Sequence, residues 1–141
     1  MAGRHRLEFH AEMPSRFAVV PRHDATAPIR WFEAKPTFMY HVSNAWEEDD
    51  GQGGTEIVMT GTPFRMPRDP LGNPKPDQFV AMLALLQNDT MFYEWRLNLR
   101  TGLVKERPLD DIVVSEFPVI NTAMTGKKTR YSWQLLMGRS D

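Results

Sequence analysis

The 141-residue sequence contains no cysteine, which excludes disulfide bonds and thiolate metal sites and is compatible with a reducing compartment. It also lacks an excess of one charge, because 17 basic and 18 acidic residues leave a formal net charge of -1. No field of one sign is available to attract a polyanion, so we expect no nucleic-acid partner. A glycine-rich phosphate loop and a nucleophile elbow are missing as well.

Long apolar runs are absent too. The longest, 79–86, is far too short to span a bilayer, and residues 1–12 are polar, unlike a secretory signal peptide. We therefore expect a soluble, cytoplasmic chain. Its length and its hydrophobic content of 41% suit one domain over residues 1–141. The chain stops shortly after the strand-like run 133–137, so we expect it to be a piece of a longer protein.

Short strand-like segments separated by turn signals fill most of the sequence and predict an all-β architecture. The candidate strands are 16–20, 29–33, 37–46, 56–60, 93–99, 103–106, 112–114 and 130–133. The clearest alternation, in 93–99, puts Trp95, Leu97 and Leu99 on one face. Residues 51–54 and 101–102 are predicted hairpin turns. Spacing of about ten residues suits a sandwich, a barrel or the blades of a propeller.

One segment departs from the β pattern. Its apolar residues recur at helical spacing: Phe79, Met82, Leu83 and Leu86. With Asp77 as a candidate N-cap, they predict one short amphipathic helix. The preceding stretch 65–76 contains four prolines and predicts a long surface loop. Loop and helix together form a predicted insertion at about 65–89. It either packs over the strands as a structural element or closes over a site as a lid, and we favour the structural role.

His41 has the most distinctive surroundings of the four histidines, because it lies in the aromatic-rich run 38–46. A buried imidazole without a partner is costly, so this ring is either hydrogen-bonded in a core or holds a ligand. No second histidine follows at i+2 or i+4, and spacing alone favours a core histidine. On a regular strand, His41 would share a face with Ser43, and Asn44 would face the other way.

The other histidines and the acidic residues give weaker signals. His5, His10 and His23 have polar neighbours and are predicted to lie at the surface. The acidic block 47–50 is typical of a solvated turn. Glu116 is flanked by apolar residues, and its burial would require a partner such as an arginine, backbone donors or an imidazole N–H. From the residues alone, exposure at a strand end is favoured.

Six blocks in sequence order resemble the carotenoid cleavage oxygenases. They are Arg16-Phe-x-x-x-Pro-Arg22; Ile29-Arg30-Trp31-Phe32; Phe38-x-Tyr40-His41-x-x-Asn44-Ala45-Trp46-Glu47; Trp95-Arg96-Leu97-Asn98-Leu99-x-Thr101-Gly102; Glu116-Phe117-Pro118-x-Ile120-Asn121; and Gly126-Lys127-Lys128-x-Arg130-Tyr131. The resemblance runs over almost the whole chain, from about residue 16 to residue 138. Each block alone is a weak signal, but six blocks in the same order are not expected by chance.

The resemblance implies a seven-bladed antiparallel β-propeller, of which this chain would supply about two blades. It implies a non-haem iron, Fe(2+), held on the propeller axis by four histidines from different blades. The implied reaction uses O2 to cleave a conjugated double bond in a carotenoid, an apocarotenoid or a stilbene-like compound, giving two carbonyl products. By position, His41 matches an iron ligand, and Glu116 matches a glutamate that accepts the free ring N–H of an iron-bound histidine.

The resemblance is incomplete. Only one of the four expected histidines can be placed, so we expect the segment alone to be inactive, because one imidazole cannot make a site. No further catalytic residue is assigned, and peripheral membrane contact of the full-length protein is compatible with the resemblance. Two alternatives remain open: a non-catalytic β-rich binding module for an apolar ligand, and a propeller relative that has lost its metal and serves as a scaffold.

Overall fold

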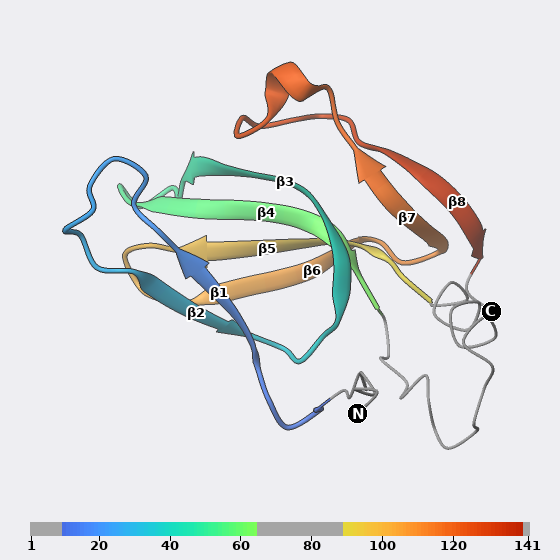
Figure 1. Ribbon diagram of the computed structural model, residues 1–141, viewed down its shortest axis with the longest axis horizontal. Helices are drawn as coiled ribbons and strands as arrows, with labels where there is room; N and C mark the ends of the chain where they lie inside the picture. The colour runs from blue at the N-terminus through green and yellow to red at the C-terminus, as the bar shows by residue number, and fades with distance from the viewer. Residues whose placement is uncertain (1–9, 65–88, 140–141) are drawn as a thin grey trace, which may run out of the picture.

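A computed structural model describes residues 10–64 and 89–139, which fold into three antiparallel sheets (Figure 1). The strands are β1 (Ser15–Val19), β2 (Arg30–Ala34), β3 (Met39–Asp49), β4 (Thr55–Pro63), β5 (Phe92–Asn98), β6 (Val104–Asp110), β7 (Val113–Val119) and β8 (Trp133–Arg139). The pair β1–β2 and the pair β7–β8 are hairpins, and β3–β4–β5–β6 form a four-stranded meander. The all-β prediction is confirmed.

Helical structure is limited to one 3-10 turn, η1 (Thr122–Met124), in the part of the chain that the structure describes. The predicted helix at 79–86 and the insertion at 65–89 lie outside the described residues, apart from residue 89. No described helix is long and apolar enough to cross a membrane. The predicted strand at 130–133 is wrong in extent, because β8 begins only at Trp133.

Both predicted hairpin turns of the meander are present. Gly102 adopts a φ of 76°, which glycine reaches without a steric penalty, and its N–H donates to the carbonyl of Asn98 at 2.9 Å. In the 51–54 turn, Asp50 Oδ1 accepts the N–H groups of Gln52 and Gly54, each at 2.8 Å. The prediction that this acid is simply solvated is wrong, because it organises the turn.

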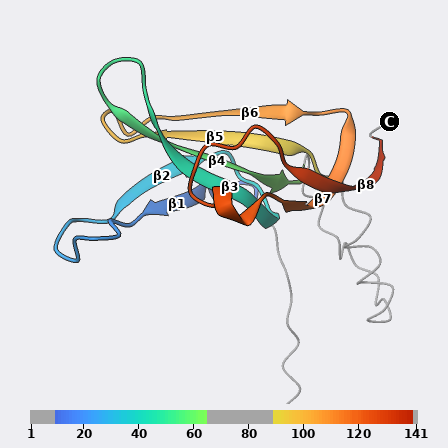
Figure 2. The ribbon, with the colours of Figure 1, turned by 90° about the horizontal axis from the view of Figure 1, so that it is seen from above.

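An apolar core lies between the β1–β2 hairpin and one face of the meander. Figure 2 shows β1 and β2 together on one side of β5 and β6. Trp95 is 1% exposed, and its ring lies 5.6 Å from that of Phe17 on β1 and 4.9 Å from that of Tyr93. Leu97 is also buried, as the alternation of β5 predicts. Burying each such side chain contributes about 1.5–3 kcal/mol.

The β7–β8 hairpin lies on the other side of the meander, where β7 runs beside β3 and β4 (Figure 1). A four-stranded antiparallel sheet is the unit from which a β-propeller is built. The strands β3 to β6 form one such blade, and the two flanking hairpins contribute two strands each. The chain thus carries strands for two blades, as predicted, but they are divided over three neighbouring sheets.

We expect Trp95→Ala to lower the free energy of unfolding by about 3–5 kcal/mol, because it leaves a cavity in the core between β5 and β1. The matched control is Trp31→Ala, since Trp31 is 55% exposed and the guanidinium of Arg16 lies over its ring at 4.7 Å. Equilibrium denaturation of both variants measures the difference. Equal losses would contradict the placement of the core.

Candidate functional site

The two site residues predicted from the sequence, His41 and Glu116, lie side by side. His41 is on β3 and Glu116 on β7, 75 positions further along the chain, and Nδ1 of the imidazole is 2.9 Å from Oε2 of the carboxylate. A carboxylate only accepts hydrogen bonds, so Nδ1–H is the donor, and the neutral ring then carries its lone pair on Nε2. The contact selects one tautomer and one orientation of the ring.

Glu116 is buried, so the surface position that its neighbours favoured is wrong. Its side chain is 11% exposed, whereas that of His41 is 44% exposed. A register shift in the β7–β8 pairing after Glu116 and a φ of 55° at Phe117 turn the backbone locally. Such a bulge re-aims a side chain, and here it directs Glu116 toward β3. The N–H of Phe117 donates to Oε2 at 2.7 Å, whereas Oε1 is buried with no hydrogen-bond partner among the described residues.

The start of β3 is irregular around His41. Register shifts relative to β4 occur on both sides of Val42, so the strict alternation expected for this strand is wrong. Gly61 on β4 lies against this segment, and a Cβ placed on it would be 2.9 Å from the carbonyl oxygen of His41. Thr62 supports the same carbonyl through a 3.4 Å hydrogen bond from Oγ1. The absence of a side chain at Gly61 therefore permits the local path of β3.

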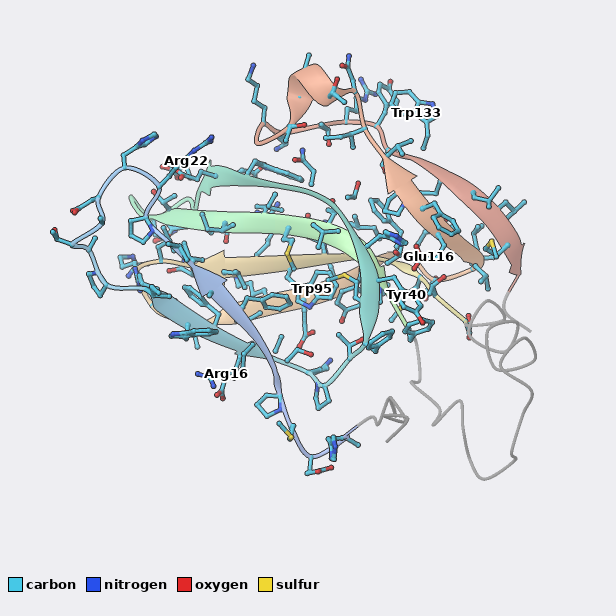
Figure 3. The ribbon with its side chains drawn as sticks, in the orientation of Figure 1. Arg16, Arg22, Tyr40, Trp95, Glu116 and Trp133 are labelled. Atoms are coloured by element: carbon cyan, nitrogen blue, oxygen red, sulfur yellow. The ribbon has the colours of Figure 1, made fainter. Side chains whose placement is uncertain are left out.

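Aromatic rings surround the pair. The ring of Phe117 lies 5.1 Å from the imidazole of His41, and the ring of Tyr40 lies 6.3 Å from it. Phe38 and Phe64 extend this group, with ring centroids 4.8 Å and 5.6 Å from that of Tyr40. Figure 3 shows Tyr40 close to Glu116. Burial, and then the negative charge of Glu116, raise the pKa of Tyr40 above its usual value, so its phenol stays protonated at neutral pH.

The other histidines do not join the site. His10 is about half exposed and lies 3.1 Å from Glu12, His23 is exposed, and His5 lies outside the described residues. Within residues 10–64 and 89–139, no group of three or more histidine, aspartate or glutamate side chains is arranged to hold a metal. His41 fits one ligand position of a metal, with its Nδ1 engaged and its Nε2 lone pair available. A complete metal site needs further ligands.

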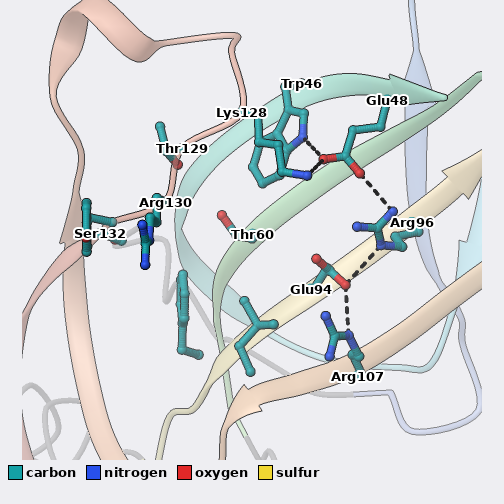
Figure 4. A pocket seen from close by; sticks show the side chains of 13 residues that line it. Trp46, Glu48, Thr60, Glu94, Arg96, Arg107, Lys128, Thr129, Arg130 and Ser132 are labelled. Carbon is teal, nitrogen blue, oxygen red and sulfur yellow. Dashed lines mark hydrogen bonds and ion pairs between the residues drawn. The ribbon is translucent and has the colours of Figure 1, made fainter.

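A second polar cluster surrounds Arg96 (Figure 4). Because side chains alternate along β5, it lies on the face of the meander opposite Trp95. Glu48 accepts from Trp46 Nε1 at 2.9 Å and from Lys128 Nζ at 2.7 Å, and it also pairs with Arg96. Arg96 contacts Glu56 and Glu94 as well. Glu48, Glu94 and Arg96 line one side of a groove of about 290 Å³, and segment 128–132 lines the other.

Sequence reasoning missed this cluster, although the alternation of β5 offered a signal. If Trp95 and Leu97 face the core, Arg96 must face the opposite side, where a charge needs partners. The solvated turn predicted for 47–50 is therefore wrong for Glu48 too, whose side chain is only 16% exposed. Hydrogen bonds from Lys128, Trp46 and Arg96 lower the pKa of Glu48 to about 2.

The whole chain, residues 1–141, matches the protein family described as retinal pigment epithelial membrane protein. It is 34% identical over 128 residues to a carotenoid 9,10(9',10')-cleavage dioxygenase 1 of Pisum sativum, which covers 89% of this chain and 21% of the relative. The chain therefore spans about a fifth of the length of the curated relatives it matches.

Solved structures show the same fold. A cobalt-substituted apocarotenoid oxygenase from Synechocystis superposes with a TM-score of 0.69 at 18% identity, covering 92% of this chain and 25% of the other. A lignostilbene dioxygenase from Pseudomonas brassicacearum gives 0.61 at 24% identity, with coverage of 90% and 25%. These likenesses confirm the predicted fold class of antiparallel propeller blades.

We expect Gly61→Ala to destabilise the protein by about 1–3 kcal/mol, because the new methyl group would press on the backbone carbonyl of His41. Gly138→Ala on β8 is the matched control, since a Cβ there meets nothing within 4 Å. The control should change stability by less than about 0.5 kcal/mol. Urea denaturation of the two variants measures both, and a harmless Gly61→Ala would contradict the close approach of β3.

The lowered pKa of Glu48 predicts a pH dependence. Its folded pKa of about 2 lies below the usual value of 4.5, so its stabilising effect is complete above pH 4.5 and is lost as the pH falls toward 2. Glu48→Gln should be less stable at pH 7 and lose less stability over that interval, as measured by denaturation at several pH values. Glu33→Gln, at a carboxylate that is 66% exposed, should keep the wild-type slope. An equal slope in the Glu48 variant would contradict this role.

Proposed function

The chain belongs to the carotenoid cleavage oxygenase family, and on that premise we propose that it supplies one side of a non-haem iron site in a dioxygenase. The complete enzyme would cleave a conjugated double bond in a carotenoid or apocarotenoid with O2, each alkene carbon gaining one oxygen atom to give two carbonyl products. The observation that supports this proposal most strongly is the 2.9 Å contact between His41 Nδ1 and Glu116 Oε2. A metal-ligating imidazole commonly donates its other ring N–H to such a carboxylate, and this likeness supports the proposal.

His41 would bind the iron through Nε2. Its partly exposed ring leaves that nitrogen accessible, and a carboxylate on Nδ1 raises the basicity of the imidazole. Neutral imidazole is a suitable ligand for Fe(2+), which when bound supplies the activation of O2. That a structural relative is described as cobalt-substituted supports a divalent metal in this family. Glu116 would hold the ring while its own burial excludes water from the hydrogen bond.

The aromatic rings beside His41 would form one wall of a substrate tunnel. Tyr40 and Phe117 present apolar surface beside His41, with the buried ring of Phe64 packed behind Tyr40. Flat rings suit a rigid polyene. Tyr40 is an uncharged phenol at neutral pH, and its surroundings raise its pKa further, so this wall carries no charge there. A lignostilbene dioxygenase among the solved structures extends the proposed substrate class to stilbene-like compounds.

The remaining metal ligands would come from parts of a longer polypeptide, because this chain spans about a fifth of its relatives' length. The described residues offer one imidazole near Glu116, and isolated imidazole binds iron poorly. Iron binding and catalysis are therefore proposed for the complete polypeptide and not for this segment. Peripheral membrane contact of that polypeptide remains a prediction.

In the complete polypeptide that carries this segment, we expect His41→Ala to lose most of its bound iron and its O2-dependent cleavage of an apocarotenoid. Glu116→Gln should bind iron about tenfold more weakly, because an amide holds the Nδ1–H less strongly than a carboxylate does. Iron is measured by elemental analysis and cleavage by chromatography of the two carbonyl products.

The matched control is His23→Ala, at an exposed histidine away from the pair, which should keep both iron and activity. Unchanged iron in the purified His41→Ala protein would contradict the ligand assignment. A wild-type protein that binds an apolar ligand but neither iron nor O2 would contradict the enzyme and favour a non-catalytic binding module.

A further inference from the structure

We propose that Asn44 is a positioning residue for the His41–Glu116 pair, because it clamps the connection between β7 and β8 onto β3. The importance of this clamp rests on the proposed function, since it would set the orientation of a metal ligand. The contacts that support it are independent of any metal. Asn44 is not among the predicted metal ligands, and the proposed reaction gives it no role.

All the hydrogen-bonding groups of the Asn44 amide are directed at one loop. Nδ2 donates to the carbonyl oxygen of Lys127 at 2.9 Å and to that of Met124 at 3.4 Å, and Oδ1 accepts the N–H of Gly126 at 3.1 Å. Asn44 is 5% exposed, so water does not compete freely for these groups. An amide is the side chain that matches this pattern, because it offers two donors and an acceptor together.

The irregular start of β3 turns Asn44 toward the same sheet as His41. The two residues are three positions apart, and on a regular strand their side chains would point to opposite faces. A register shift between Val42 and Asn44 breaks the alternation. As a result His41 reaches Glu116 on β7, and Asn44 reaches the loop that follows β7. The β7–β8 hairpin is therefore held by one strand at two separate points.

Internal hydrogen bonds also hold the connection between β7 and β8 in one conformation. A contact to this connection therefore also restrains the strands on either side of it. Asn121 caps η1 by accepting the N–H of Ala123 at 3.1 Å, and Lys127 N–H returns to the carbonyl of Met124 at 2.9 Å. Two further contacts join β3 to this connection: Ser43 Oγ lies 3.1 Å from Ser132 Oγ, and Lys128 pairs with Glu48 (Figure 4). Asn44 is the most buried member of this group.

Apolar packing contributes little to holding the β7–β8 hairpin, because its large apolar side chains are about half exposed. On β8, Trp133 is 58% exposed and Leu135 is 56% exposed, and Phe117 on β7 is 48% exposed. Figure 3 shows Trp133 at the end of the hairpin remote from Tyr40 and the core tryptophan. The β1–β2 hairpin, by contrast, is held by the buried rings around Trp95. The polar clamp, together with the 2.7 Å hydrogen bond that Thr90 Oγ1 donates to the carbonyl oxygen of Ser115 on β7, therefore places Glu116 opposite His41.

The test reads the tautomer of His41 in the complete, metal-free polypeptide labelled with 15N-histidine. The His41 signals are assigned by their loss in His41→Ala, and the spectra are recorded where the imidazole is neutral. We expect the proton on Nδ1 in the wild type. Asn44→Ala and Asn44→Asp should lower the ratio of the Nδ1–H to the Nε2–H form roughly tenfold, the factor for losing a charge-assisted hydrogen bond. The peptide that contains the Phe117 amide should exchange faster in both variants.

The matched control is Asn98→Ala at the far end of β5. It removes a comparable set of amide contacts, to Asp50 and to the N–H groups of Arg100 and Thr101. It should lower stability and leave the His41 tautomer unchanged. An unchanged tautomer in both Asn44 variants would overturn the proposal, as would an equal change in Asn98→Ala.

Unfolding of both Asn44 variants alongside a folded Asn98→Ala protein would also overturn the positioning role, in favour of a general structural one. Because the tautomer is read without metal, this result is separate from that of the iron measurements. Loss of iron in His41→Ala with an unchanged tautomer in the Asn44 variants contradicts only the clamp. A shifted tautomer in a protein that never binds iron contradicts only the proposed function.

Discussion

Hydrogen bonds from β3, and one from Thr90 to the carbonyl oxygen of Ser115, attach the β7–β8 hairpin to the meander, and the position of Glu116 depends on that attachment. His41 and Asn44 each hold a different part of the hairpin. Hydrogen bonds are directional and fix relative position closely, whereas apolar contact is not directional. The β1–β2 hairpin covers one face of the meander, and the apolar rings around Trp95 are sufficient to hold it there. The site formed by His41 and Glu116 lies between two sheets, so their relative position has to be fixed by directional hydrogen bonds.

This constraint carries costs that the local structure offsets only in part. A carboxylate as buried as Glu116 loses its hydration, and it regains hydrogen bonds from His41 and from the N–H of Phe117. Oε1 remains without a partner among the described residues, and a φ of 55° at an aromatic residue costs of the order of 1–3 kcal/mol. Strain and an unsatisfied polar atom at one place are typical of a functional site.

Sequence periodicity predicted the part of the fold that obeys it. The alternation of β5 placed Trp95 and Leu97 in the core, and glycine-containing turns located the hairpins of the meander. It failed where a bulge interrupts the alternation, which is why the shared orientation of His41 and Asn44 was not predicted. Periodicity also says nothing about pairing across 75 residues, so it favours a surface position for Glu116, and only the family resemblance relates this residue to a histidine.

The ionic cluster illustrates another limit of the sequence. Glu48 lies in a run of acids that is typical of a solvated turn, yet its partners Lys128 and Arg96 come from other elements and become visible only in the fold. The insertion predicted at 65–89 lies almost entirely outside the described residues and stays a prediction. The sequence alone therefore predicts strands and one core face well, and long-range polar pairs poorly.

The central claim is that Glu116 holds Nδ1 of His41 so that Nε2 is presented to a metal. It is tested most directly by a crystal structure of the complete polypeptide loaded with cobalt, with the metal located by anomalous scattering. We predict the metal about 2.0–2.1 Å from Nε2 of His41, the usual length of a bond from imidazole to such a metal, with Nδ1 still on Glu116. A metal bound away from His41, or through Nδ1 with Glu116 turned aside, would contradict the account.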